Sequence, residues 1–144
     1  SWLINVATSN ILPLCSLDLA LWRLSLCGLR KILMKYTGSC HCQKVTFSCD
    51  FQLQQPTMCN CSYCSKRNAV LHIVDDIEIL NGQEALSCYR FNKMKGAHYF
   101  CKYCSIFIYN TPPEPVYPYA ISLCTLDDCE WQQLPIHYFD GKPL

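Results

Sequence analysis

The sequence predicts a mainly β domain built from antiparallel sheets. Apolar residues occur in short runs that turn-forming residues separate, as in strand-rich proteins. Val45, Phe47 and Cys49 alternate with polar residues, which is typical of a half-buried strand. Charged residues make up only 16% of the 144-residue chain, which also has nine tyrosines, so the composition favours a compact β-rich domain over a disordered one.

Residues 1–33 have a different character from the rest of the chain. This segment is rich in leucine but is a poor membrane span, because charges interrupt it at Asp18, Arg23, Arg30 and Lys31. Its positive charges follow the apolar run, the reverse of a secretory signal. We expect residues 1–33 to lie outside the functional domain, as an upstream extension or an artefact, and residues 34–144 to form that domain. The alternative is an amphipathic helix that packs on the domain or on a partner.

The strand that contains Val45 and the others are predicted from short apolar runs along the chain. They occupy residues 45–49, 70–74, 77–80, 88–91, 98–100, 106–109, 119–123 and 136–139. Asn81-Gly82 predicts a turn, and the prolines within 111–115 predict a loop, because proline cannot donate to a strand ladder. Residues 62–68 are the best site for a helical turn.

Seven of the thirteen cysteines fall into three tight clusters with metal-ligand spacing. In an extended segment Cys40 and Cys42 would point to one face and His41 to the other. The middle cluster, Cys59, Cys61 and Cys64, can converge on one ion. A tight turn would bring Cys101 and Cys104 to one ion. Grouped as two, three and two thiolates, they can form a closed four-sulfur zinc site and a three-sulfur site with a vacant position, and so bind two zinc ions per chain.

A disulfide framework is the alternative for these cysteines. The odd cysteine count, the strain in disulfides between cysteines two residues apart and the lack of a secretory signal all weigh against it. The lone cysteines are expected to be small buried apolar residues: Cys15, Cys27, Cys49, Cys88, Cys124 and Cys129.

Charge and cysteine usage restrict the partners and the compartment. The formal net charge is +1, so the chain has no strongly basic character with which to bind nucleic acid. Reduced cysteines without a secretory signal favour a reducing compartment, and we expect a cytoplasmic protein without a membrane partner.

The three cysteine motifs together resemble those of the glutathione-dependent formaldehyde-activating enzyme family, which includes centromere protein V. Gly38-Ser39-Cys40-His41-Cys42 is similar to the first motif of that family, Cys59-Asn60-Cys61-Ser62-Tyr63-Cys64 to the second and Phe100-Cys101-Lys102-Tyr103-Cys104 to the third. The resemblance runs from about residue 36 to 143. Gln43 and Ser105 stand where the family usually has glycine, so either can alter its turn.

The resemblance implies a fold and an activity. The expected fold is Mss4-like, with antiparallel sheets and zinc-bearing turns. A structural zinc would be bound by Cys40, Cys42, Cys101 and Cys104, and a second zinc by Cys59, Cys61 and Cys64. The family's named activity condenses formaldehyde with glutathione to S-(hydroxymethyl)glutathione, formally a carbon–sulfur lyase in reverse.

Two function classes therefore stay open at this point. The first is a zinc-dependent enzyme that acts on glutathione adducts or on another small thiol. The second is a zinc-stabilised protein-binding module without catalysis. A fourth ligand at the middle cluster, from His72, His98, Cys88, Cys124 or Cys129, would favour the second class.

Other side chains have two interpretations each. Lys66 and Arg67 either attract a peptide carboxylate or form a solvated surface pair. Tyr109, Tyr117 and Tyr119 either line a pocket or form a sheet face. His72 and His137 are expected to be packing histidines.

Overall fold

The computed structural model describes residues 32–91, 93, 95–112 and 116–142 of the chain. The predicted N-terminal extension lies outside these residues except for its last two, Ile32 and Leu33, which are both exposed. Residues 32–144 form one compact unit, which carries all three cysteine clusters. The fold is mainly β, with two sheets that belong to the Mss4-like type expected above.

The first sheet has three antiparallel strands in the order β1-β2-β5. These strands are β1 (Met34–Ser39), β2 (Thr46–Phe51) and β5 (Glu78–Asn81). The half-buried pattern predicted for β2 is wrong at Ser48, which is as buried as its neighbours. The Ser48 hydroxyl donates to a carboxylate oxygen of Glu78 at 3.3 Å. This hydrogen bond satisfies a polar side chain on the face of β2 that was expected to be exposed.

The second sheet has seven strands in the order β10-β3-β4-β9-β8-β7-β6. Their bounds are β3 (Thr57–Cys59), β4 (Leu71–Val74), β6 (Leu86–Phe91), β7 (Gly96–Cys101), β8 (Phe107–Thr111), β9 (Tyr119–Ser122) and β10 (His137–Phe139). The strand pairs are antiparallel as expected, except at one edge, where β10 runs parallel to β3. The connection from β9 passes through two 3₁₀ turns, Leu123–Thr125 and Trp131–Gln133, and brings β10 to the edge in the direction of β3.

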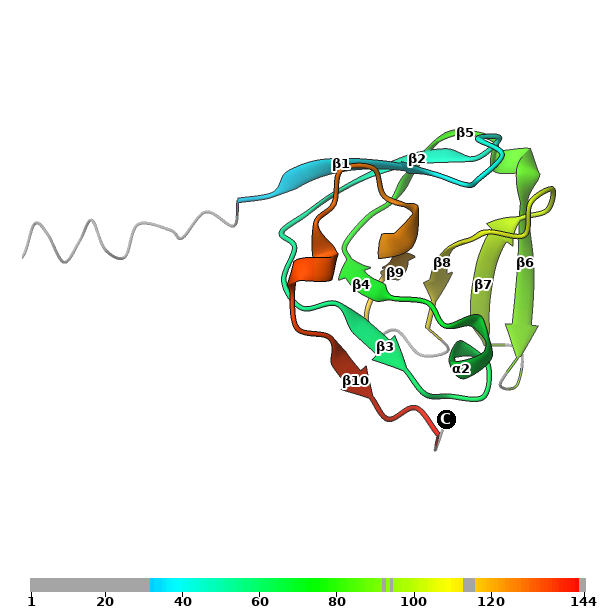
Figure 1. The fold of residues 1–144 in the computed structure, drawn as a ribbon. Helices are drawn as coiled ribbons and strands as arrows, with labels where there is room; N and C mark the ends of the chain where they lie inside the picture. Colours follow the sequence, from blue (N-terminus) through cyan, green and yellow to red (C-terminus); the bar gives the residue numbers. More distant parts are fainter. Residues whose placement is uncertain (1–31, 92, 94, 113–115, 143–144) are drawn as a thin grey trace, which may run out of the picture. The chain divides into compact units, whose positions relative to one another are not determined.

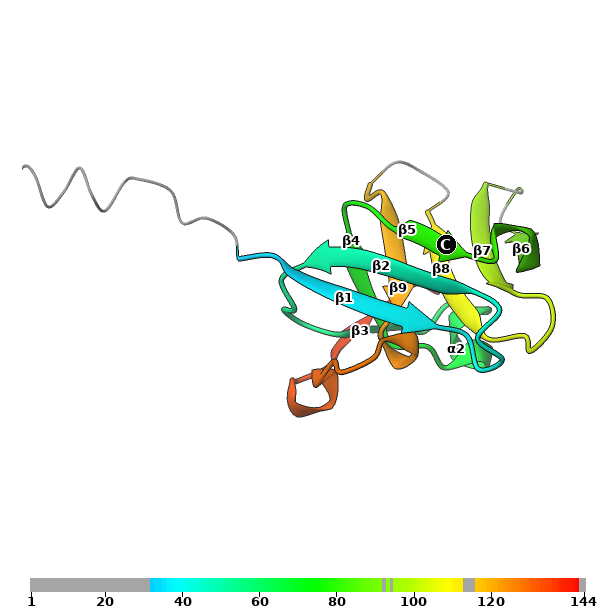
Figure 2. The same cartoon turned by 90° about the horizontal axis from the view of Figure 1, so that it is seen from above.

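The core lies between the two sheets: Figure 1 shows β1, β2 and β5 above the strands of the second sheet, and Figure 2 shows them in front of it. Its largest fully buried side chains include Phe47 from β2, Ile108 from β8 and Ile121 from β9. Burial of each such side chain is worth about 1.5–3 kcal/mol. The predicted strands at 70–74, 77–80, 88–91, 98–100, 106–109, 119–123 and 136–139 each overlap a strand of the structure.

Two local features follow the predicted turn chemistry. The short helix α2 (Cys64–Arg67) lies within the predicted helical segment and ends at Asn68, whose φ is 54°. Gly82 follows β5 with φ of 81°, and a Cβ there would lie 1.9 Å from the carbonyl oxygen of Lys44. This turn therefore requires glycine. Among the described residues no helix is long and apolar enough to cross a membrane.

Candidate metal centres

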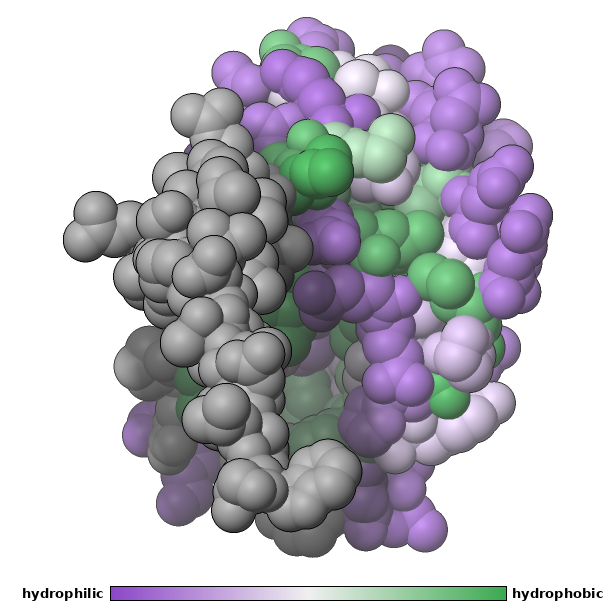
Figure 3. Space-filling view, turned by 90° about the vertical axis from the view of Figure 1, so that its left-hand side faces the viewer, coloured by the Kyte–Doolittle hydropathy of each residue, from purple (hydrophilic) through white to green (hydrophobic). Residues whose placement is uncertain are grey.

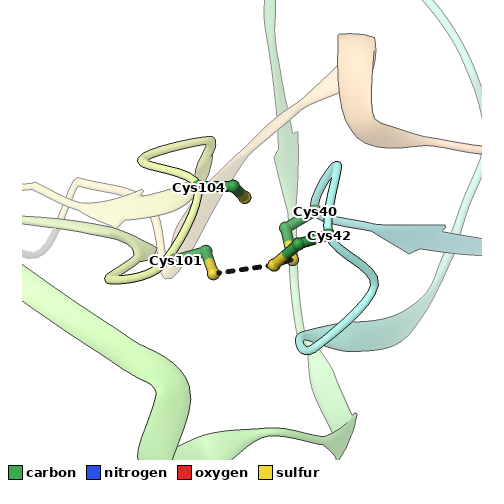
Figure 4. Close-up of side chains that lie close together, drawn as sticks. All are labelled: Cys40, Cys42, Cys101 and Cys104. Carbon is green, nitrogen blue, oxygen red and sulfur yellow. Dashed lines mark hydrogen bonds between the residues drawn. The ribbon is translucent and has the colours of Figure 1, made fainter.

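Four cysteines from two distant turns meet at one end of the sheets. Cys40 and Cys42 lie in the β1–β2 connection, whereas Cys101 ends β7 and Cys104 lies in the β7–β8 connection (Figure 4). All four sulfurs lie within 4.8 Å of one another. The Sγ–Sγ distance is 3.6 Å both for Cys40 and Cys42 and for Cys42 and Cys101. Four Zn–S bonds of about 2.3 Å in a tetrahedron place the sulfurs about 3.8 Å apart, so this set fits zinc.

The two turns of the four-sulfur cluster are built alike. The backbone N–H of Cys40 donates to the carbonyl oxygen of Val45, five residues later. The N–H of Cys101 donates in the same way to the carbonyl oxygen of Ile106. The sequence prediction of an extended segment at Cys40 to Cys42 is wrong, because the N–H of Gln43 closes a tight turn on the carbonyl of Cys40 at 3.0 Å. The two sulfurs converge through this turn rather than through strand alternation.

The backbone is left-handed at Gln43 and Ser105, the two positions where the family resembled above usually has glycine. Gln43 has φ of 59° and Ser105 has φ of 63°, one in each turn of the four-sulfur cluster. A residue with a Cβ pays about 1–2 kcal/mol in this region. The two departures from glycine therefore keep the turn geometry and add backbone strain.

The three-sulfur cluster lies where β3 leads into α2. Cys59 ends β3, Cys64 begins α2 and Cys61 lies between them, and their sulfurs lie within 4.8 Å of one another. Backbone N–H groups point at two of the sulfurs: the N–H of Cys61 lies 3.4 Å from Cys59 Sγ, and that of Cys64 lies 3.3 Å from Cys61 Sγ. Such donors stabilise thiolates, and thiolates are the ligands that a soft metal such as zinc prefers.

The three-sulfur cluster borders a cavity of about 420 Å³. All three cysteines line the cavity, together with apolar side chains from β4, β6, β9 and β10. In the part of the chain that the structure describes, no histidine, carboxylate or further cysteine joins the three sulfurs as a fourth ligand. A metal held by these three thiolates would keep a coordination position for a small molecule.

Arg67 links the three-sulfur cluster to His98. One guanidinium nitrogen lies 3.4 Å from Cys64 Sγ, and another lies 3.0 Å from His98 Nδ1. The guanidinium also lies 3.5 Å from the centre of the Phe107 ring. Since arginine has only donors, His98 Nδ1 accepts, and the proton of a neutral imidazole is on Nε2. Arg67 thus belongs to the site, whereas Lys66 is exposed and matches the solvated alternative.

Burial and hydrogen bonds shift the acidity of these groups. Burial, and then the nearby Arg67, lower the pKa of His98 to about 4, so the ring is neutral at pH 7. Burial raises the pKa of the Cys64 thiol to about 12, against the opposing attraction of Arg67. For Cys61 burial acts to raise the pKa, but hydrogen bonds from the backbone of Cys64 and Tyr63 and from the neighbouring cysteine side chains together outweigh it, so the pKa is lowered. A metal ion binds the deprotonated sulfurs and releases their protons.

The other predicted residues divide between the site and the scaffold. Tyr117 lines the cavity, whereas Tyr109 stacks on Tyr99 at 4.5 Å and meets Tyr119 edge-on. The prediction for His72 holds, since its ring accepts from the Gln54 N–H and contacts the Ile73 carbonyl. The prediction for His137 is wrong, because this residue is exposed and lines the cavity beside the β3 edge.

The lone cysteines only partly follow the expectation of burial. Cys49 is buried in the core and Cys129 is partly buried, but Cys88 and Cys124 are exposed. Cys88 is exposed because it points outward from β6. Cys124 is exposed because it lies on the first 3₁₀ turn after β9. Cys15 and Cys27 lie outside the described residues.

The segment after β10 packs against the three-sulfur cluster, which the sequence did not reveal. The Asn60 side chain donates to Asp140 at 2.9 Å and accepts from the Gly141 N–H at 2.7 Å. A Cβ on Gly141 would lie 2.5 Å from Cys59 Sγ. The sequence has two related features: Asn60 lies between two ligand cysteines, and Asp140-Gly141 is a turn-forming pair. Neither feature predicts that the two segments, about 80 residues apart, are in contact.

Comparison with known proteins agrees with this geometry. A crystal structure of a Rhodobacter sphaeroides protein, a structural genomics target, matches with a TM-score of 0.63 at 24% sequence identity, covering 72% of this chain and 99% of that chain. At this identity the match supports the fold. The family model described as glutathione-dependent formaldehyde-activating enzyme matches residues 35–140, which include both sulfur clusters and the segment after β10. The chain therefore belongs to the glutathione-dependent formaldehyde-activating enzyme family.

Proposed function

We propose that this protein binds two zinc ions and acts as a carbon–sulfur lyase-type enzyme on glutathione adducts or on a related small thiol. The four-sulfur cluster is the structural site, and the three-sulfur cluster is the reactive one. One observation carries this proposal: three convergent thiols, without a fourth ligand among the described residues, border a cavity of about 420 Å³. A reducing compartment such as the cytoplasm would keep these thiols free and supply glutathione.

The reaction proposed for this site joins a thiol to an aldehyde. The sulfur of glutathione attacks the carbon of formaldehyde, a carbon–sulfur bond forms, and the carbonyl oxygen takes up the proton that the thiol gives away. The product is S-(hydroxymethyl)glutathione, and the reverse direction breaks the same bond. Zinc at the three-sulfur site would lower the thiol pKa, so that a thiolate is available near neutral pH.

The side chains around the cavity have separate tasks in this proposal. Three thiolates give a zinc site a net charge of about −1, and the Arg67 guanidinium beside Cys64 offsets it. Neutral His98 lies in the cavity wall, and its ring proton is on Nε2 because Nδ1 accepts from Arg67. The walls are mostly apolar, and a hydrogen bond to the reacting groups is stronger where the local dielectric constant is low.

Exchange NMR tests this function at equilibrium. Because formaldehyde and glutathione also combine without a catalyst, the measured quantity is the exchange rate between ¹³C-formaldehyde hydrate and S-(hydroxymethyl)glutathione. We expect the wild-type protein to accelerate this exchange and the variant Cys61→Ser to lose the acceleration. Cys88→Ser is the matched control, since Cys88 is exposed on β6 and belongs to neither cluster. Equal rates with and without wild-type protein would refute the enzymatic function.

A protein-binding module is the second candidate, and exposed apolar side chains favour it. Ile73, Val116 and Phe139 surround the cavity with 55%, 75% and 46% of their surface exposed. On the face that Figure 3 shows, hydrophobic residues reach the surface between hydrophilic ones. If the exchange assay shows no catalysis while both metals bind, this candidate is the better account.

A further inference from the structure

The cavity beside the three-sulfur cluster contains few polar groups, and no aspartate, glutamate, lysine or arginine is among its described lining residues. Two of its polar residues, His98 and Asn110, are almost completely buried, with 6% and 5% of their surface exposed. They are cross-strand partners on β7 and β8 and therefore share one face of the sheet. His98 and Asn110 are thus held by strands rather than by loops.

Asn110 orients the hydroxyl of Tyr117. The Asn110 side-chain amide donates to Tyr117 Oη at 3.4 Å, so the tyrosine oxygen accepts from the protein and its own proton is free to be donated. The Tyr117 ring packs against the apolar cluster of Ala69, Leu71, Phe107 and Ala120, which fixes its position. Burial raises the pKa of Tyr117 against the lowering effect of the Asn110 hydrogen bond.

This arrangement leaves hydrogen-bonding capacity unused. The Asn110 side-chain oxygen is buried and has no partner in the described part of the protein. A buried polar atom without a partner costs about 1–3 kcal/mol, which an apolar residue at this position would avoid. At 3.4 Å the contact between Asn110 and Tyr117 is also longer than an ordinary hydrogen bond. The Tyr117 hydroxyl keeps a proton that no hydrogen bond among the described residues uses, and a ligand oxygen in the cavity can accept it.

We propose that Tyr117, held by Asn110, donates a hydrogen bond to the ligand oxygen in the cavity, and that the ligand is a thiol adduct with an oxygen on a carbon close to its sulfur. This inference rests on the function proposed above and names the residue that recognises the oxygen. No lysine, arginine or carboxylate in these walls can pair with the charged groups of a peptide thiol, so these groups lie outside the cavity and only the reacting end enters it.

A pair of small thiols tests the inference without an activity measurement. 2-Mercaptoethanol and 1-propanethiol have nearly the same size and differ in a terminal hydroxyl or methyl group. Both are titrated into cobalt-substituted protein, whose absorption reports sulfur ligation. We expect the wild-type protein to prefer 2-mercaptoethanol, and Tyr117→Phe to lose about fivefold to tenfold of this preference, the value of one hydrogen bond. Binding of 1-propanethiol should change less than twofold.

Tyr119→Phe is the matched control, because Tyr119 packs edge-on against Tyr109 in the core and keeps the preference intact. Circular dichroism checks that each variant is folded. If both thiols bind and Tyr117→Phe shows the wild-type preference, the inference is overturned while the proposed function stands. If neither thiol changes the wild-type spectrum, the proposed function fails and the inference fails with it.

Discussion

Replacement of Arg67 by methionine isolates the contribution of one side chain to the three-sulfur site. The change removes the donor that lies 3.4 Å from Cys64 Sγ and the contact with His98, but keeps an unbranched side chain against Phe107. A hydrogen bond to a charged acceptor is worth about 1.5–3 kcal/mol. Residues that support metal ligands in this way typically change metal affinity about 10- to 100-fold. We expect a loss of this size at the three-sulfur site and no change at the four-sulfur site.

Competition with a zinc chelator of known affinity measures both sites in one titration. The control variant is Lys66→Met, which removes the neighbouring positive charge from an exposed side chain. We expect this control to stay within twofold of the wild-type affinity. Circular dichroism establishes that both variants are folded. The reasoning is refuted if Arg67→Met weakens the three-sulfur site less than threefold, or if Lys66→Met weakens it equally.

Three further predictions concern the two clusters. Cys40→Ser should unfold the domain, because structural zinc binding is coupled to folding, whereas Cys61→Ser should keep its circular dichroism spectrum and lose one zinc ion; equal unfolding of both variants would show that the three-sulfur site is also structural. Gln43→Gly should stabilise the metal-bound protein by about 1 kcal/mol in denaturant unfolding, because it relieves a φ of 59°, and a lower stability would contradict this. Gly141→Ala should weaken zinc binding at the three-sulfur site, since its Cβ would lie 2.5 Å from Cys59 Sγ; unchanged affinity would show that the terminal segment moves aside without cost.

The sequence predicted those parts of the protein that depend on local spacing. The cysteine clusters are short-range patterns, and zinc coordination restricts the ways in which they can combine. The strand at 70–74 and the helical turn at 62–68 also follow from neighbouring residues, so the structure agrees with both. The family motifs added the pairing of the first cluster with the third, which spans about sixty residues.

Elements that depend on distant contacts were missed. In the strand β1 only Tyr36, Gly38 and Ser39 are buried or partly buried, and just one of them is a large apolar residue, so no apolar alternation marks the strand. The strand β3 has three residues, which is too short for a periodic pattern. The parallel pairing of β10 depends on the path of the chain after β9, and a three-residue strand does not specify its own direction.

The cavity wall shows the same limit at the level of single residues. Tyr117 and Tyr109 look alike in the sequence, yet only Tyr117 lines the cavity. Arg67 and Lys66 are adjacent, yet only the arginine turns toward the sulfurs, because one turn of α2 places it above Phe107. Tertiary packing decides which side of an element faces the site. A segment without clear hydrophobic periodicity gives no indication of that side in its sequence.

X-ray absorption at the zinc edge tests the central claim most directly, because it counts the sulfur ligands of the bound metal. Protein loaded with two zinc ions should show a mean sulfur coordination below four per zinc, since one of the two sites offers only three thiols. Addition of glutathione should raise this mean to four, and the Cys61→Ser variant should not show the rise. A mean of four before any thiol is added, or a mean that glutathione leaves unchanged, would contradict an open three-sulfur site that accepts a thiol.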